Sequence, residues 1–270
     1  MMTNFYFLNQ YDVKVHFFPA ANAADMGINL ILLPAIGVPI AKYQRFIQQL
    51  NSVGLNVITA DYPCCGENLP HVDKTVDYNY SQLIHDFIGK LVELSGSKTT
   101  VLLGHSLGAH LATLYATQHQ IAVIGIATGN IYYKNWHGVG RAKILAVALL
   151  FRILSRTYGY FPGYKVGFGY KETKGVMDNW CHTALTGNYD FFAKNLSKAQ
   201  VNSYFIQIQG DEFAPMASTI GLANYFEQKI VEQIQLAPNF KGNKHSIWLK
   251  EPSLVVEKVL HFLVNDQSAH

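Results

Sequence analysis

The sequence predicts one α/β domain built on a mostly parallel β-sheet. Short apolar runs alternate with segments of helical periodicity, a pattern typical of βαβ units. The 270 residues are 49 % hydrophobic and only 14 % charged, which is the composition of a folded globular chain. The alternation is interrupted once, between about residues 130 and 196, and then resumes, which indicates an insertion into the domain.

The predicted strands follow from runs of apolar residues. The first segment, FYFLNQYDVKVHFF, reads as two antiparallel edge strands. The later runs read as strands of the parallel part, and the first of them is apolar almost throughout, as expected of a strand covered on both faces. They are NLILLPA (29–35), LNVITADYP (55–63), TTVLLG (99–104), IAVIGIATG (121–129), SYFIQIQG (203–210) and IVEQIQLAP (230–238).

The predicted helices follow from apolar residues three and four positions apart. In segment 42–54 these are Tyr43, Phe46, Ile47 and Leu50, and Gly54 ends the pattern. Three further segments have the same character: YSQLIHDFIGKLVELSG (80–96), LGAHLATLYATQH (107–119) and SLVVEKVLHFLVND (253–266).

The interrupting segment is rich in tyrosine, tryptophan and glycine and contains one apolar helix. We interpret residues 130–196 as a cap inserted into an α/β core that comprises residues 1–129 and 197–270. The run Ile144 to Phe151 is too short to span a membrane, so we expect it to be buried in the core or, alternatively, to touch lipid at an interface.

Composition excludes several function classes. The formal charge is only +3 and the lysines and arginines are scattered, which argues against nucleic-acid binding. Three cysteines without metal-ligand spacing predict neither a disulfide framework nor a metal site, and no cofactor motif is present. The N-terminal segment has no secretory pattern, so we expect a cytoplasmic protein without a transmembrane segment. The sequence leaves the oligomeric state open.

One motif carries chemistry. GHSLG, Gly104 to Gly108, fits G-x-S-x-G between a predicted strand and a predicted helix. In that setting the serine occupies a strained turn that exposes its hydroxyl at the carboxyl end of the sheet, and the two glycines avoid collisions with the neighbouring strand and helix. Ser106 is therefore the candidate nucleophile.

A serine nucleophile needs a base that is oriented by an acid. In FIQIQGDEFAP, Asp211 directly follows a predicted strand, and the adjacent Glu212 stays open as an alternative acid. His245 lies in a loop rich in Gly and Asn before the last helix and is the candidate base. Four other histidines fit less well, because they lie inside the last helix, beside the serine or at the chain end: His261, His105, His110 and His270.

A tetrahedral intermediate also needs two backbone N–H groups around its oxyanion. We expect one from Leu107, the residue after the serine. The second should come from PAIGVP, the loop after the first parallel strand, where Ile36 is the best candidate.

These residues resemble the α/β-hydrolase superfamily. GHSLG, DEFAP and the late His245 match its triad order, and PAIGVPIAKY is similar to the H-G-x-x-x-x-S-x-x-Y stretch of lysophospholipase-like and monoglyceride-lipase-like members. YGYFPGYKVGFG further resembles a group of uncharacterised bacterial hydrolases. The resemblance implies an α/β-hydrolase fold with a helical cap, but Pro34 and Ala35 replace the usual His-Gly pair.

The predicted function is that of a serine hydrolase acting on a carboxylic ester or thioester. Aromatic residues of the cap favour a small to medium apolar acyl group. Two alternatives remain: an acyltransferase with the same triad, or a binding protein without catalysis on the same fold.

Overall fold

The computed structural model describes residues 1–21, 25–237 and 241–267. The main sheet of this part of the chain has eight strands: β1 (Met2–Phe7), β2 (Tyr11–Phe18), β3 (Ile28–Leu33), β4 (Asn56–Thr59), β5 (Thr99–His105), β6 (Val123–Ile126), β9 (Ala199–Ile208) and β10 (Phe226–Ile234). Their spatial order is β1-β2-β4-β3-β5-β6-β9-β10. The first two pair antiparallel and the remaining six run parallel, which confirms the predicted sheet.

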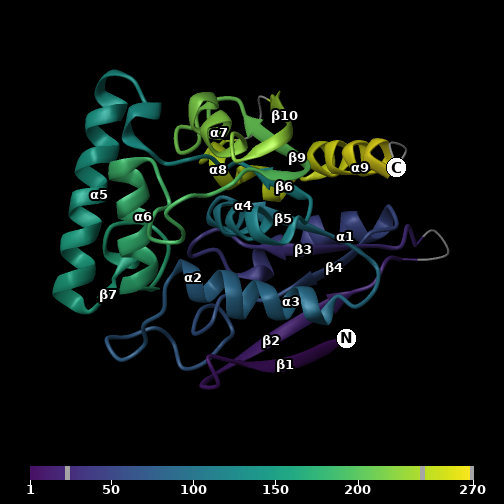
Figure 1. Ribbon diagram of the computed structural model, residues 1–270, viewed down its shortest axis with the longest axis horizontal. Helices are drawn as coiled ribbons and strands as arrows, with labels where there is room; N and C mark the ends of the chain where they lie inside the picture. The colour runs from purple at the N-terminus through teal and green to yellow at the C-terminus, as the bar shows by residue number, and fades with distance from the viewer. Residues whose placement is uncertain (22–24, 238–240, 268–270) are drawn as a thin grey trace.

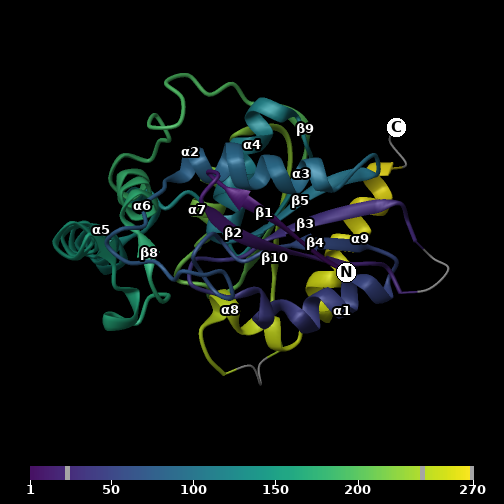
Figure 2. The same cartoon turned by 90° about the horizontal axis from the view of Figure 1, so that it is seen from below.

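Helices cover both faces of this sheet (Figures 1 and 2). Both faces need cover because the side chains of β3 alternate between two apolar clusters. Leu30 and Leu32 lie in the first cluster, and Ile31 and Leu33 lie in the second. The first cluster contains side chains of η1 (Ile40–Tyr43), α1 (Gln44–Ser52), η5 (Trp248–Lys250) and α9 (Ser253–Gln267).

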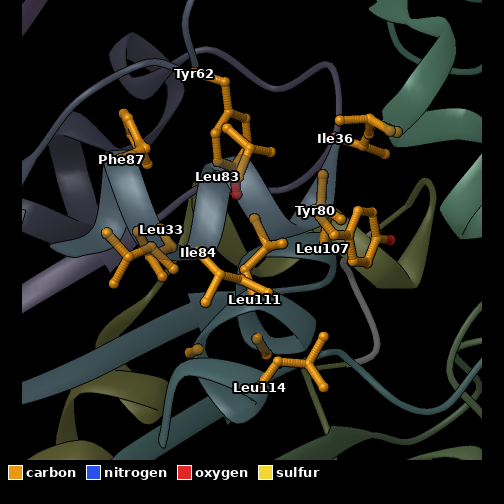
Figure 3. Close-up of a cluster of buried hydrophobic side chains, with 14 of the residues drawn as sticks. Leu33, Ile36, Tyr62, Tyr80, Leu83, Ile84, Phe87, Leu107, Leu111 and Leu114 are labelled. Carbon is orange, nitrogen blue, oxygen red and sulfur yellow. The ribbon is translucent and has the colours of Figure 1, made fainter. Parts of the chain in front are cut away.

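The second cluster lies under α2 (Tyr80–Gln82), η2 (Leu83–Ile88), α3 (Gly89–Leu94) and α4 (Leu107–His119). Figure 3 shows its centre, where Ile84 of η2 lies beside Leu111 of α4. Residues 80–94 form one continuous helical segment, as predicted, but its middle turn is a π-helix. Both faces of the sheet are therefore closed by apolar packing, which fixes the strand ends that carry the site.

Some strand boundaries differ from the prediction. β4 ends at Thr59 instead of Pro63, because Asp61 leaves the ladder and accepts hydrogen bonds from the N–H groups of Ile40 and Glu67. β9 starts at Ala199, before the predicted residue 203, and β10 covers Phe226–Ile234. The predicted end of that last strand, residue 238, lies outside the described residues.

The insertion, residues 130–196, contains two long helices where the sequence predicted one. Its elements are η3 (Tyr133–Asn135), α5 (Gly138–Tyr158), β7 (Tyr160–Phe161), η4 (Gly163–Lys165), β8 (Glu172–Thr173) and α6 (Lys174–Thr186). α6 was not predicted because the polar residues Asn179 and His182 interrupt the row of apolar residues along this helix. Thr173 nevertheless caps the helix by accepting the Val176 N–H, and its buried side chains include Met177 and Trp180.

Two helices of the C-terminal part were not predicted from the sequence. α7 (Met216–Ala223) begins directly after Pro215, whose carbonyl oxygen accepts the N–H groups of Ser218 and Thr219. α8 (Lys244–Ile247) is a single turn that carries His245. The side-chain oxygen of Asn243 caps this turn by accepting the backbone N–H of His245. The predicted base thus lies on a short capped helix rather than in an irregular loop.

Candidate active site

The turn between β5 and α4 holds Ser106 in a strained conformation. Its φ is 52° and its ψ is −114°, a combination that L-residues rarely adopt. A Cβ at Gly104 would lie 2.2 Å from the Ala109 nitrogen, and one at Gly108 would lie 2.1 Å from the Leu33 carbonyl oxygen. Only glycine therefore fits on either side of this serine, as the motif predicts.

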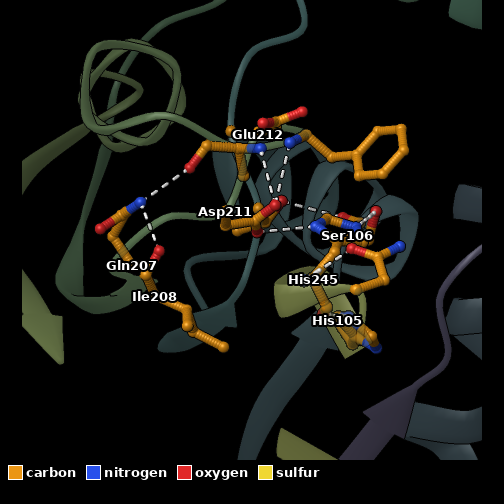
Figure 4. Close-up of polar contacts among 12 residues, drawn as sticks. His105, Ser106, Gln207, Ile208, Asp211, Glu212 and His245 are labelled. Carbon is orange, nitrogen blue, oxygen red and sulfur yellow. Dashed lines mark hydrogen bonds and ion pairs between the residues drawn. The ribbon is translucent and has the colours of Figure 1, made fainter. Parts of the chain in front are cut away.

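Three side chains from distant parts of the chain meet at this turn (Figure 4). His245 Nε2 lies 2.8 Å from Ser106 Oγ, and His245 Nδ1 lies 2.8 Å from Asp211 Oδ2. Because an ionised carboxylate only accepts hydrogen bonds, Nδ1 carries the proton and Nε2 accepts the serine hydroxyl. The structure thus brings together the serine, histidine and aspartate that the sequence selected.

Asp211 is held in place by the turn that follows β9. Its Oδ1 accepts the N–H groups of Phe213 at 2.9 Å and Ala214 at 3.3 Å, and its side chain is buried. The amide of Gln207 donates to the carbonyl oxygens of Ile208 and Ala214 and braces the same turn (Figure 4).

The alternative acid, Glu212, is directed elsewhere. Its side chain is exposed, and its carbonyl oxygen accepts the indole N–H of Trp136. Asp211 is therefore the acidic side chain in contact with the His245 ring.

Two buried N–H groups near Ser106 have no acceptor within the described residues. They belong to Ile36, in the turn after β3, and to Leu107, the first residue of α4. The first turn of a helix leaves such donors free, and an unpaired buried N–H is otherwise rare. These are the two groups expected around an oxyanion.

The loop that carries Ile36 is anchored by two tyrosines. Tyr62 donates its hydroxyl to the Pro34 carbonyl oxygen at 2.8 Å, and the Ala35 N–H donates to the Tyr43 hydroxyl oxygen at 2.8 Å. These bonds fix the loop although Pro34 and Ala35 replace the usual His-Gly pair.

His105 links this loop to the helix of His245. Its Nε2 donates to the His245 carbonyl oxygen at 2.9 Å, so its Nδ1 is free to accept the Tyr43 hydroxyl at 2.7 Å. Burial lowers the pKa of His105 to about 3, which keeps the ring neutral and this pattern intact at neutral pH. His105 is therefore not the base, as its position beside the serine indicates, and its supporting contacts could not be predicted from the sequence.

The insertion also contacts the loop around Ile36. Gly37 has a φ of 65°, and a Cβ there would lie 2.2 Å from the Gly169 Cα. Glu172 is 3 % exposed and accepts the Gly37 N–H. Burial raises the pKa of Glu172 to about 8, and the hydrogen bond from Gly37 opposes that rise.

Ser106 opens into a pocket of about 160 Å³ that is covered by the insertion through Ile131, Phe168 and Trp180. A second, more apolar cavity of about 230 Å³ lies under α5. The two cavities share lining residues and are therefore adjacent; the shared residues are Ile131, Gly167, Phe168, Trp180 and Phe213.

The expectation that aromatic residues of the insertion line the site holds for only part of them. Trp136, Phe168 and Trp180 line the two cavities, whereas Tyr164 and Tyr170 are exposed on the surface.

The cysteines have no part in this arrangement. Cys64, Cys65 and Cys181 are free thiols, and burial raises the pKa of Cys64 and of Cys181 to about 12. Within residues 1–21, 25–237 and 241–267, no group of His, Cys, Asp and Glu side chains is arranged to hold a metal ion.

Comparison with known proteins identifies similar chains. A family model described as the alpha/beta hydrolase family matches residues 30–251. A search of curated proteins gives no match.

Similar solved structures cover nearly the whole chain. A soluble variant of monoglyceride lipase from Saccharomyces cerevisiae is 15 % identical with a TM-score of 0.70, and the match covers 97 % of this chain and 94 % of that one. Est1E from Butyrivibrio proteoclasticus with bound ferulic acid is 14 % identical with a TM-score of 0.68, covering 98 % and 99 %. A structure from a study of Nitrososphaera gargenis carboxylesterases is 16 % identical with a TM-score of 0.65, covering 96 % and 97 %. At these identities the likeness shows the fold.

Proposed function

Since the chain belongs to the alpha/beta hydrolase family, we propose that it is a serine hydrolase that cleaves a carboxylic ester or thioester with a small to medium apolar acyl group. The observation that carries this proposal is the hydrogen-bonded series from Ser106 Oγ through the His245 ring to Asp211. The relatives described as esterases and as a monoglyceride lipase support the same reaction class.

Acylation begins with proton transfer from Ser106 to His245. Nε2 takes the hydroxyl proton while Oγ attacks the acyl carbon, and the buried Asp211 carboxylate stabilises the imidazolium and keeps Nδ1 protonated. The carbonyl oxygen of the substrate becomes an oxyanion, which the N–H groups of Ile36 and Leu107 stabilise.

The intermediate then collapses and loses its leaving group. His245 Nε2–H gives its proton to the departing alcohol or thiol, which leaves an acyl ester on Ser106. Water repeats the sequence: His245 accepts a proton from the water as it attacks, and then returns a proton to Ser106 as the carboxylic acid is released.

The apolar cavities support an uncharged acyl group. The pocket over Ser106 and the neighbouring cavity are lined by aliphatic and aromatic side chains such as Ile131, Val147 and Trp180. Such a surface gains free energy by burying apolar area, which favours an apolar acyl chain.

We also propose the domain boundaries suggested by the sequence. Residues 1–129 and 197–270 would form the hydrolase core and residues 130–196 its cap. Location in the cytoplasm stays a prediction.

Labelling with a fluorophosphonate probe tests the proposed function. An activated serine is phosphonylated, so the wild-type protein should be labelled, and the Ser106→Ala and His245→Ala variants should not. His261→Ala removes an exposed histidine of α9 and serves as the matched control that keeps labelling. Folded wild-type protein that resists the probe would refute the proposal and favour a binding protein on this fold, whereas labelling that survives Ser106→Ala would refute Ser106 as the nucleophile.

A further inference from the structure

Exposed apolar side chains are concentrated on the insertion. Of the sixteen large hydrophobic side chains that are exposed among the described residues, eight lie between residues 139 and 170. Single exposed apolar residues are normal on protein surfaces, but a group of them on one segment marks an interaction site. The eight are Val139, Leu149, Leu150, Ile153, Tyr158, Tyr164, Val166 and Tyr170.

Four of them follow one face of α5 together with two exposed alanines. Except for the adjacent pair Leu149 and Leu150, successive members of this set of six are three or four positions apart. Residues with that spacing share one face of a helix. We call this set the α5 face: Val139, Ala142, Ala146, Leu149, Leu150 and Ile153. Val139 is 85 % exposed and Ile153 is 62 % exposed.

The α5 face points away from the rest of the molecule. A different side of the same helix provides the packing contacts, through the buried Ala148, Phe151 and Ser155. In both views of the ribbon, α5 forms the outer edge of the molecule at the end opposite the C-terminus (Figures 1 and 2). The helix is therefore apolar on two sides, and only one of them is covered.

The charge around this face has one sign. Residues 138–171 contain six lysines and arginines and no aspartate or glutamate, so this segment carries a formal charge of +6 while the whole chain carries +3. Among the described residues, only Arg156 of these six lies within 4.0 Å of a carboxylate, that of Asp178. The six are Arg141, Lys143, Arg152, Arg156, Lys165 and Lys171.

We propose that the α5 face docks on the surface of an anionic lipid membrane. An apolar helix face flanked by basic side chains gains affinity from burial at the headgroup boundary and from attraction to anionic lipids. A second copy of this chain would instead bring a like charge of +6 against the same face. No helix within the described residues is long and apolar enough to cross a membrane, so the contact is peripheral.

The cavity under α5 reaches the surface at this face. Leu150 of the α5 face and the exposed Val166 both line it, as does Lys143 at the side of the helix. The cavity adjoins the pocket of Ser106. This step rests on the proposed function: an ester dissolved in the membrane can pass under α5 to the serine without crossing bulk water.

Co-sedimentation with sucrose-loaded vesicles tests the docking. The protein carrying Ser106→Ala, which cannot consume lipid, should bind vesicles of phosphatidylcholine mixed with phosphatidylglycerol and should bind pure phosphatidylcholine much more weakly. The bound fraction should fall as salt is added. Because binding is measured without catalysis, the result is independent of the proposed hydrolase activity.

Matched substitutions locate the contact. Leu149→Glu with Ile153→Glu should reduce the vesicle partition coefficient at least tenfold, whereas Ile230→Glu, at an equally exposed site on β10, should leave it unchanged. Unaltered hydrolysis of a short soluble ester by the double variant with Ser106 in place would show that the two substitutions leave the protein folded, and circular dichroism provides the same check for the Ser106→Ala protein.

Three results would overturn the proposal. The first is no binding to anionic vesicles at low salt, and the second is equal binding by the double variant. The third is a dimer that sedimentation velocity detects for the protein without the double substitution and not for the double variant, since this would assign the face to a second copy of the chain.

Discussion

At the scale of single residues, Asp211 has one task, which is to hold the His245 ring with its proton on Nδ1. Its Oδ2 lies 2.8 Å from Nδ1, while its Oδ1 is occupied by two backbone N–H groups. The side chain therefore cannot turn away from the histidine without losing these bonds. The exposed Glu212 beside it has no such restraint.

Replacing Asp211 should impair catalysis and leave the protein folded. Asp211→Asn should lower kcat on the order of 10⁴-fold, because the amide can donate to Nδ1 and would favour the wrong tautomer. Glu212→Gln should leave kcat unchanged. Steady-state hydrolysis of an activated ester measures both, and a larger loss for Glu212→Gln would show that the acid has been wrongly assigned.

The sequence could select Ser106, Asp211 and His245, which the structure brings together, but not the contacts that support them. Ser106, Asp211 and His245 each follow a predicted strand, and parallel strands bring their carboxyl ends to one edge. The link from Ala35 through Tyr43 and His105 to the His245 carbonyl depends on side-chain contacts between residues as far as 140 positions apart. No local pattern reports such contacts.

At the scale of elements, the turn from β5 to α4 depends on glycine at two positions. Gly104→Ala should destabilise the protein by at least about 2 kcal/mol, because the new Cβ meets backbone atoms that cannot move without displacing α4. Gly89→Ala is the matched control, since a Cβ there meets no atom within 4 Å. It should raise stability by roughly 0.5–1 kcal/mol, the cost of glycine inside a helix.

Urea unfolding of the wild type and both variants measures these changes. A Gly104→Ala protein as stable as the wild type would mean that the turn is not closely packed against α4.

The contact between the insertion and the loop around Ile36 should be sensitive to pH. Burial raises the pKa of Glu172 from its ordinary value of 4.5 to about 8, so the folded protein holds this proton more tightly than the unfolded chain does. The resulting stability is complete below about pH 4.5 and is lost as the pH rises through about 8. The buried His105 acts in the opposite direction, but only between about pH 3 and 6.5.

Glu172→Gln isolates this effect, because the amide oxygen can still accept the Gly37 N–H but does not titrate. We expect the stability of the wild type relative to this variant to decline between about pH 4.5 and 8, as measured by urea unfolding at a series of pH values. A constant difference across that range would show that the Glu172 carboxyl titrates as it does in water.

The elements that the sequence missed have a common cause. α6 and α7 mix polar and apolar residues along their length, and tertiary packing stabilises them more than their own periodicity does. The long regular helices, by contrast, could be predicted from spacing alone. α4 coincides with the predicted range, and α9 differs from it by one residue at its end.

At the scale of the whole molecule, residues of the segment 130–196 line both cavities beside Ser106. Val147 projects from α5 into the cavity of about 230 Å³, whereas Leu149, two residues on, is exposed on the outer side of the same helix. Val147 therefore faces the cavity, whereas Leu149 faces away from it.

Val147→Trp should shift the preferred acyl chain to a shorter length. Filling the cavity should lower kcat/KM for long acyl esters by at least about tenfold and leave an acetate ester unaffected, because a short acyl group needs only the pocket over Ser106. Leu149→Trp is the control and should leave the chain-length profile of soluble esters as it is. Identical profiles for the wild type and Val147→Trp would place the acyl group outside this cavity.

The central claim is that Ser106 carries the acyl group during turnover. The most direct measurement is mass spectrometry of peptides from protein quenched in acid while it hydrolyses an activated ester. The proposed mechanism predicts an acyl adduct on the peptide that contains Ser106, formed by the wild type and absent from Ser106→Ala. Turnover without any adduct on Ser106, or an adduct on another side chain, would contradict it.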